Sequence, residues 1–267
     1  MNKDQILLKS YIRSLLIIFT ACFLYQSIPA HAHPSVQTDS SSINKINQIL
    51  AIKTNNSIND QSAAFLGVPY RANTLIGSVT VPERLTINLN AVDCLTFIEY
   101  VHALNHSTNL QDFTTNLIKT RYINENVSFL NRKHFFSDWF ATYPRNARDI
   151  TKTLSPNVIA VRKHLNLGPN NKEYIRGLGI IPRTIYYIPT AGINAHVVSQ
   201  LKTGDFIGIY TPLNGLDVSH VGIIIKHQNK TYFRNASSLA RNMRVIDSPL
   251  LPYVRNKPGI IVLRITP

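Results

Sequence analysis

The chain has 267 residues with 44% hydrophobic content, which supports a hydrophobic core and allows one large domain or two small ones. Its formal net charge of +14 at pH 7 favours anionic surroundings, such as membrane surfaces, wall polymers or acidic ligands. Nucleic-acid binding, the other usual meaning of a basic chain, is not supported, because the Lys and Arg residues are scattered and no binding motif occurs.

The first 32 residues have the pattern of a secretory signal peptide. Three basic residues lie within residues 1–13, an apolar run covers residues 14–25, and the sequence AHA at 30–32 is a small-x-small cleavage pattern. The apolar run is shorter than the roughly 20 residues that span a bilayer as a helix. Acylation at Cys22 or an uncleaved anchor fits less well, since apolar residues follow Cys22 and a cleavage site lies further on. We therefore expect export to the periplasm or the exterior, with no stable membrane insertion after cleavage.

Cleavage after residue 32 would leave a mature chain, residues 33–267, with a single cysteine. The removed segment contains three basic residues, one acidic residue and Cys22, so the mature net charge is +12 and the remaining cysteine is Cys94. Exported proteins usually pair their cysteines. A single one therefore indicates a reactive thiol or an intermolecular partner, or else a buried and inert side chain.

The N-terminal half of the mature chain reads as mainly helical. After a polar leader, the apolar spacing predicts a helix over residues 43–52 and a further helical turn at 62–65, which the sequence GVPY at 67–70 ends. Residues 75–89 alternate and are expected to be extended. The best helical pattern of the chain starts at Asp93, where apolar residues recur at Phe97, Val101 and Leu104.

The C-terminal third changes to short apolar runs joined by tight turns. The runs are predicted to be strands at residues 206–210, 218–225, 231–235 and 259–265, with turns at 212–217 and 227–230. Residues 111–200 are mixed, and no repeat or low-complexity linker marks a domain boundary. A helical part followed by an antiparallel meander predicts an α+β fold in one domain.

Cys94 is placed where a thiol can be chemically useful. It lies in the first turn of its predicted helix with Asp93 as the expected N-cap, and free backbone N–H groups at a helix start favour a thiolate. His220 stands out among the histidines as a general base, because it begins a rigid apolar β run. Asn235 ends the next predicted strand, so it lies close enough to orient the imidazole, unless it merely starts the following loop.

Three other chemistries are weaker. Glu99, His102 and His106 lie at i, i+3 and i+7 on the Cys94 helix, which allows a zinc site, but a solvated polar stripe explains them more simply. No G-x-S-x-G motif supports a serine hydrolase, and no glycine-rich loop would hold a phosphate. We therefore expect neither a metal nor a cofactor.

Several sequence blocks, taken together, resemble a known family. They are FLGVPYRANTLIG at 65–77, VPERLTINLNAVDCLTFIE at 81–99, LKTGDFIGIY and LDVSHVGI within 201–223, and RNASS at 234–238. In this order they resemble the N-acetylmuramoyl-L-alanine amidase-like family, first catalogued as a domain of unknown function, within the papain-like NlpC-type cysteine peptidase superfamily. The resemblance runs from about Ile43 to the end.

The resemblance implies a papain-like NlpC-type α+β fold over residues 33–267. In such a fold the nucleophile helix packs on an antiparallel sheet, here with N-terminal helical additions. Carried over by motif, the nucleophile falls on Cys94, the base on His220 and the third polar residue on Asn235. At this last position we expect the family often to have His in a His-Ala-Ser motif, so Asn235 is a departure. Its side-chain carbonyl can still accept the Nδ1–H bond of His220, so we keep Asn235 in the orienting role.

Three further residues are expected to bind substrate. Asp93 would cap the helix or bind a substrate amine or hydroxyl, and Tyr70 and Arg71 would line the cleft. The implied substrate is peptidoglycan or a muropeptide, cut between the lactyl group of N-acetylmuramic acid and L-alanine through a thioester. An endopeptidase that cuts within the stem peptide, for example after γ-D-glutamate, and a non-catalytic wall-binding module with an inert Cys94 remain as alternatives.

Overall fold

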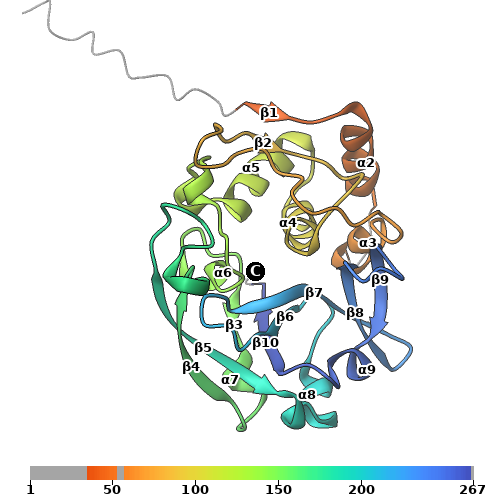
Figure 1. Cartoon of the computed structure of the whole chain (residues 1–267). Coiled ribbons are helices and arrows are strands. Elements are labelled where there is room, and N and C mark those ends of the chain that lie inside the picture. Colours follow the sequence, from red (N-terminus) through yellow and green to blue (C-terminus); the bar gives the residue numbers. More distant parts are fainter. Residues whose placement is uncertain (1–34, 53–56, 266–267) are drawn as a thin grey trace, which may run out of the picture. The chain divides into compact units, whose positions relative to one another are not determined.

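The computed structural model describes residues 35–52 and 57–265, and all elements named here belong to one unit, Ser35–Pro267 (Figure 1). The predicted signal peptide lies outside the described residues. Within them, no helix is both long and apolar enough to cross a membrane.

Helices occupy most of the N-terminal half and recur between the strands of the C-terminal half. The α-helices are α2 (Ser40–Leu50), α3 (Ser57–Ala63), α4 (Cys94–Asn105), α5 (Leu110–Arg121), α6 (Asp138–Ala141), α7 (Thr151–Leu154), α8 (Ala195–Gln200) and α9 (Leu250–Val254). Short 3-10 turns are η1 (Ile123–Glu125), η2 (Phe129–Asn131), η3 (Pro169–Asn171) and η4 (Thr190–Gly192).

An antiparallel sheet forms the centre of this unit. Its strands are β3 (Arg148–Asp149), β4 (Ile159–Leu165), β5 (Ile181–Pro189), β6 (Phe206–Tyr210), β7 (Val218–His227), β8 (Lys230–Ser237), β9 (Arg244–Pro249) and β10 (Gly259–Arg264). They run in the order β4-β5-β10-β6-β7-β8-β9, with β3 paired to β10. A separate parallel pair joins β1 (Val36–Gln37) to β2 (Leu85–Thr86).

The sheet buries apolar side chains on both faces because its central strands are apolar at consecutive positions. In β7, Val221, Ile223 and Ile225 join one core cluster, whereas Ile224 between them joins the other. Helices α2 to α5 contribute to the first cluster, and α7 to α9 to the second. Figure 1 shows these two groups of helices on opposite sides of β6 and β7.

Helix α4 is the central helix of the first cluster. All its residues from Thr96 to Leu104 are buried, and it packs on β7 and β8 as well as on α3 and α5. A helix that is buried on nearly every side is apolar around most of its circumference, as this one is. This packing fixes the start of α4 against the strands that carry the candidate catalytic residues.

The α+β fold is confirmed, and so is the start of the central helix at Cys94. The predicted strands at 206–210, 218–225, 231–235 and 259–265 correspond to β6, β7, β8 and β10. The predicted first helix is α2, shifted by two to three residues towards the N-terminus. Strands β3, β4, β5 and β9 were not predicted, and the expected extended segment 75–89 contains only the short β2.

Candidate active site

Helix α4 starts at Cys94, and Asp93 and Thr96 form a capping box at this end of the helix. Oδ1 of Asp93 accepts the Thr96 backbone N–H at 2.8 Å, and the Asp93 backbone N–H donates to Oγ1 of Thr96 at 2.9 Å. These reciprocal bonds satisfy donors that a helix start leaves free. The cap therefore holds the backbone of Cys94 in place, as expected for Asp93.

Backbone amides surround the sulfur of Cys94. The N–H groups of Cys94 itself, Leu95 and Val221 are hydrogen-bonding neighbours that lower the pKa of the thiol. Val221 directly follows His220 in β7, so the sulfur lies beside the strand that carries the candidate base. The structure thus brings together residues 94 and 220, which are far apart in the sequence.

The Cys94 thiol is nevertheless held protonated. Burial of the sulfur and, next, the nearby Asp93 carboxylate raise the pKa of Cys94 to about 12, outweighing the three amides. The amides at the helix start lower the pKa of the thiol as expected, but desolvation and the capping carboxylate raise it more, so the net shift is upward.

His220 forms a hydrogen bond with Asn235 on the neighbouring strand. Nε2 of His220 lies 3.0 Å from Oδ1 of Asn235. Nδ2 of Asn235 donates to the Phe233 carbonyl at 3.0 Å and to Oγ of Ser248 at 3.4 Å. A carbonyl oxygen can only accept, so the amide must turn its own oxygen towards His220.

This orientation assigns the protonated nitrogen of the imidazole. Because Oδ1 of Asn235 accepts, Nε2 of His220 carries the proton and Nδ1 keeps its lone pair. The sequence argument placed the orienting bond on Nδ1, and the structure corrects this to Nε2. Nδ1 is thus the nitrogen that can take a proton from a thiol.

The surroundings of His220 keep it neutral. Burial has the largest effect and lowers the pKa of His220 below its ordinary value of 6.5, and Lys257 lowers it further. The hydrogen bond to Asn235 and the Asp93 carboxylate raise this pKa, but the net direction is downward. A neutral imidazole can act as a general base.

The three predicted binding residues have different positions. Asp93 and Tyr70 lie at the site, because Tyr70 pairs with Val92 and its pKa is raised by burial and by the neighbouring Cys94 and Asp93. The backbone N–H of Arg71 donates to the Val92 carbonyl at 3.0 Å, while the residue itself is exposed. The structure therefore places residues 70 and 71 beside the start of α4 through backbone pairing.

Sequence reasoning missed two groups near the site, Tyr253 in α9 and Lys257 in the turn before β10. Burial and then Cys94 raise the pKa of Tyr253 to about 12, so its hydroxyl is protonated at neutral pH. Lys257 lowers the pKa of His220. Both lie in a segment whose sequence pattern shows no catalytic motif, so only the fold reveals them.

The alternative metal ligands are engaged with other partners. Glu99 forms a buried ion pair with Arg121, with Oε2 and Nε 2.7 Å apart. Nδ1 of His102 lies 2.8 Å from Oγ1 of Thr120, and its Nε2 lies 3.0 Å from the Asn146 carbonyl. Glu99 and His102 are buried, so the expectation of a solvated polar stripe is wrong. No group of metal-ligating side chains occurs among the described residues.

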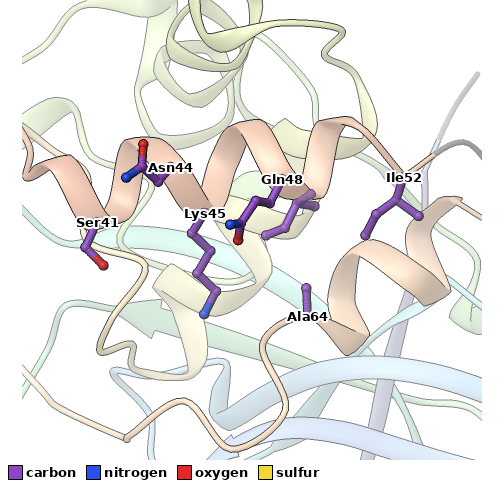
Figure 2. Close-up of a pocket in the computed structure, with 7 residues that line it drawn as sticks. Ser41, Asn44, Lys45, Gln48, Ile52 and Ala64 are labelled. Atoms are coloured by element: carbon purple, nitrogen blue, oxygen red, sulfur yellow. The ribbon is translucent and has the colours of Figure 1, made fainter.

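A pocket elsewhere in the unit lies along α2. It has a volume of about 680 Å³ and is lined by Ser41, Asn44, Lys45, Gln48, Ile49, Ile52 and Ala64. Figure 2 shows Lys45 on α2 and Ile52 just beyond the end of this helix, both on the side of the segment that carries Ala64. Nζ of Lys45 donates to the Leu89 carbonyl at 3.2 Å. None of the lining residues is Cys94, His220 or Asn235, so we do not assign the chemistry to this pocket.

Comparison with a family model identifies the family of the chain. The model described as N-acetylmuramoyl-L-alanine amidase-like (AmiA-like) matches residues 60–260. The chain belongs to this family. The matched range of the amidase-like family includes the helix start at Cys94, the His220–Asn235 pair and the Tyr253 segment.

Solved structures are similar over most of the amidase-like chain. An N-acetylmuramoyl-L-alanine amidase from Bacteroides uniformis has 30% identity and a TM-score of 0.64, covering 77% of this chain and 97% of its own. A Bacteroides fragilis protein provisionally described as a xylanase has 28% identity and a TM-score of 0.63, covering 76% of this chain and 99% of its own.

A third structure shows the same fold with a lower identity. It is a protein from Legionella pneumophila assigned to the DUF1460 family, with 24% identity, a TM-score of 0.67 and coverage of 85% of this chain and 89% of its own. At this identity the likeness shows the fold alone. Comparison with curated proteins gives no match.

Proposed function

We propose that this amidase-like protein is an exported cysteine amidase with a papain-like fold. It hydrolyses peptidoglycan or its fragments at the amide bond between the lactyl group of N-acetylmuramic acid and L-alanine. The observation that carries the proposal is the juxtaposition at the start of α4, where the Cys94 sulfur lies beside the backbone of Val221 and the preceding His220 is hydrogen-bonded to Asn235. The family match and the B. uniformis relative support the bond chosen.

The first half-reaction forms a thioester. Nδ1 of His220 takes the proton from Sγ of Cys94 while the sulfur attacks the substrate carbonyl carbon. The backbone N–H of Cys94 at the helix start stabilises the resulting oxyanion. The carbon–nitrogen bond then breaks, and the imidazolium of His220 returns its proton to the departing amine of L-alanine.

The second half-reaction releases the sugar acid. Water attacks the thioester carbonyl and gives a proton to His220, the carbon–sulfur bond breaks, and the thiol of Cys94 recovers that proton. Asn235 accepts the Nε2–H of His220 throughout and thereby keeps Nδ1 available. At the end of the second half-reaction, the thiol of Cys94 and the neutral imidazole of His220 are both regenerated.

The pKa values indicate when the proton moves. The pKa of the thiol is raised to about 12 and that of the imidazole is lowered, so proton transfer from Cys94 to His220 by itself is uphill. The transfer is therefore expected to accompany the attack, because the negative charge then passes from sulfur to the oxyanion. A bound substrate also excludes water and strengthens the amide hydrogen bonds.

Two other activities fit less well. A stem-peptide endopeptidase would use the same cysteine and histidine on a different bond, so the products decide between them. A glycosidase, as the B. fragilis name implies, needs two carboxyl groups flanking the bond. The charged groups that influence Cys94 and His220 include one carboxylate, that of Asp93, which caps α4.

The test of the proposal is loss of hydrolysis in Cys94→Ala. With purified muropeptides, we expect its rate to fall at least about 1,000-fold, because the covalent route is lost. Far-UV circular dichroism should show an unchanged fold. Retained hydrolysis in Cys94→Ala would show that this thiol is not the nucleophile, and loss of wild-type activity on adding a chelator would indicate a metal-dependent reaction. No hydrolysis by the wild type would support a non-catalytic wall-binding role.

A further inference from the structure

A chain of aromatic contacts leads from the proposed base to a lysine. The ring of Phe233 lies 6.1 Å from the His220 ring, and the ring of Tyr253 lies 4.8 Å from Phe233. Nζ of Lys257 lies over the Tyr253 ring, 5.7 Å from its centroid. Phe233 is fully buried, so the contacts from β8 to α9 fix this arrangement.

Among the residues that the structure describes, the ammonium of Lys257 has no carboxylate partner. The ion pairs of the described residues each join an arginine to Asp or Glu, and none of them includes Lys257. The residue is exposed, so its Nζ can reach a ligand from solvent. The aromatic ring beneath it attracts the cation and restricts where it lies.

An unneutralised cation here has a cost for the proposed reaction. His220 becomes positively charged when it takes the thiol proton, and a nearby ammonium disfavours that state. A negatively charged group of the substrate placed on Lys257 would remove this penalty. The lysine thus fits a role in binding substrate better than a role in assisting the base by itself.

We propose that Lys257, held over the ring of Tyr253, binds a free carboxylate of the stem peptide and makes the enzyme selective for acidic over amidated muropeptides. The inference rests on the proposed amidase function. Glutamate follows L-alanine in the stem and is linked through its γ-carboxyl group, which leaves an α-carboxylate free one residue beyond the scissile bond. A carboxylate one residue beyond the scissile bond can reach past His220 to the ammonium that lies over the Tyr253 ring.

Arg71 is the rival cation. It is exposed and lies next to Tyr70 on the segment paired with Val92. Nothing in the structure connects its guanidinium to the ring chain that ends at His220. The assignment therefore falls on Lys257, and Arg71→Gln serves as a competing variant in the test.

The test compares two matched substrates, N-acetylmuramoyl-L-alanyl-D-glutamate with the γ-carboxyl group amidated in both and the α-carboxyl group free in one and amidated in the other. We expect the wild type to prefer the acid in kcat/KM by about tenfold, as one charge-assisted hydrogen bond provides. Lys257→Gln should bring this ratio close to one by lowering kcat/KM for the acid. Lys257→Arg should keep most of the preference.

The control variant is Lys202→Gln. Lys202 is exposed and lies beside the far end of β7, where the Gly204 N–H donates to the Ile224 carbonyl, so its ratio should equal that of the wild type. Equal rates of the wild type on both substrates, or a ratio lost in Arg71→Gln and kept in Lys257→Gln, would overturn this inference alone. No cleavage of either substrate by the wild type would instead contradict the proposed function.

Discussion

At the scale of single residues, the two members of the proposed catalytic pair, Cys94 and His220, are both neutral. Burial holds the thiol of Cys94 protonated and the imidazole of His220 unprotonated. The amides of Cys94, Leu95 and Val221 lower the pKa of the thiol, but only partly. A protonated thiol is oxidised more slowly than a thiolate, so this arrangement slows oxidation of Cys94.

The first residue-scale prediction concerns the charge of Asp93. Asp93→Asn removes the carboxylate that raises the pKa of Cys94 while an amide oxygen can still cap the helix. The thiolate is then disfavoured less, so the pKa of Cys94 should fall from about 12. The pH dependence of alkylation by iodoacetamide measures this. An unchanged or higher midpoint in the variant would contradict the assigned effect of Asp93.

The second residue-scale prediction concerns the acid limb of the pH profile. His220 is active when unprotonated, and burial lowers its pKa, so kcat/KM should persist as pH falls and be lost only below the ordinary value of 6.5. Asn235, Lys257 and Asp93 also face the ring, and removing the positive charge in Lys257→Gln should move the limb to higher pH. A limb above 6.5 in the wild type would contradict a buried, neutral base.

Two of these residues could be proposed from the sequence, because each is an unusual residue type at its position in a predicted helix or strand. A single cysteine at a helix start and a histidine at the head of an apolar strand are visible without a structure. The nitrogen that Asn235 orients depends on Phe233 and Ser248, which lie on two strands. Such three-dimensional details could not be predicted from spacing.

At the scale of elements, α4 positions the site because it is anchored from within the core. Glu99 and Arg121 form a buried ion pair between α4 and α5, and Nη1 of Arg121 also donates to the Thr86 carbonyl of β2 at 2.8 Å. Burial raises the pKa of Glu99, and Arg121 opposes this rise. The pair therefore links three elements behind the nucleophile.

The element-scale prediction is that Glu99→Gln strongly destabilises the fold. The substitution leaves the guanidinium of Arg121 buried without its counter-charge, which typically costs about 3–5 kcal/mol. Urea unfolding at pH 7 should show a loss of this size. Glu125→Gln is the matched control, because Glu125 is exposed and should change stability by about 0.5 kcal/mol or less. Equal stability of the two variants would show that the pair does not support α4.

Two of the strands that were not predicted, β4 and β9, have sequences that lack the usual strand pattern. Strand β4 pairs only with β5 and exposes most of its side chains, so its Arg, Lys and His residues hide the strand pattern. Strand β9 contains Asp247 and ends in Pro249, and it lies at the edge of the sheet, where proline is tolerated. By contrast, nearly all residues of β6 and β10 are buried and apolar, so both strands could be predicted from their apolar runs.

At the scale of the whole molecule, the most prominent property is a large positive net charge, which the fold itself does not require. The chain carries +14, and +12 once the predicted signal peptide is removed. Charge of this size raises the local concentration of anionic polymers near the protein. It therefore suits a substrate that is an acidic wall polymer or its fragments.

We expect salt to weaken binding to the wall. The Cys94→Ala protein should co-sediment with insoluble peptidoglycan at low ionic strength and be released as salt rises to about 1 M, where charges are screened beyond roughly 3 Å. Sedimentation followed by protein assay measures the bound fraction. Binding that does not respond to salt would indicate that the positive charge has no part in wall association.

Mass spectrometry of muropeptides digested with the wild type and with Cys94→Ala shows directly which bond is cut and whether the thiol is needed. With the wild type we expect free disaccharide together with an intact stem peptide that starts at L-alanine, and with Cys94→Ala neither product. A disaccharide that still carries L-alanine and glutamate would show cleavage within the stem, and the same products from Cys94→Ala would show that this thiol is not the nucleophile.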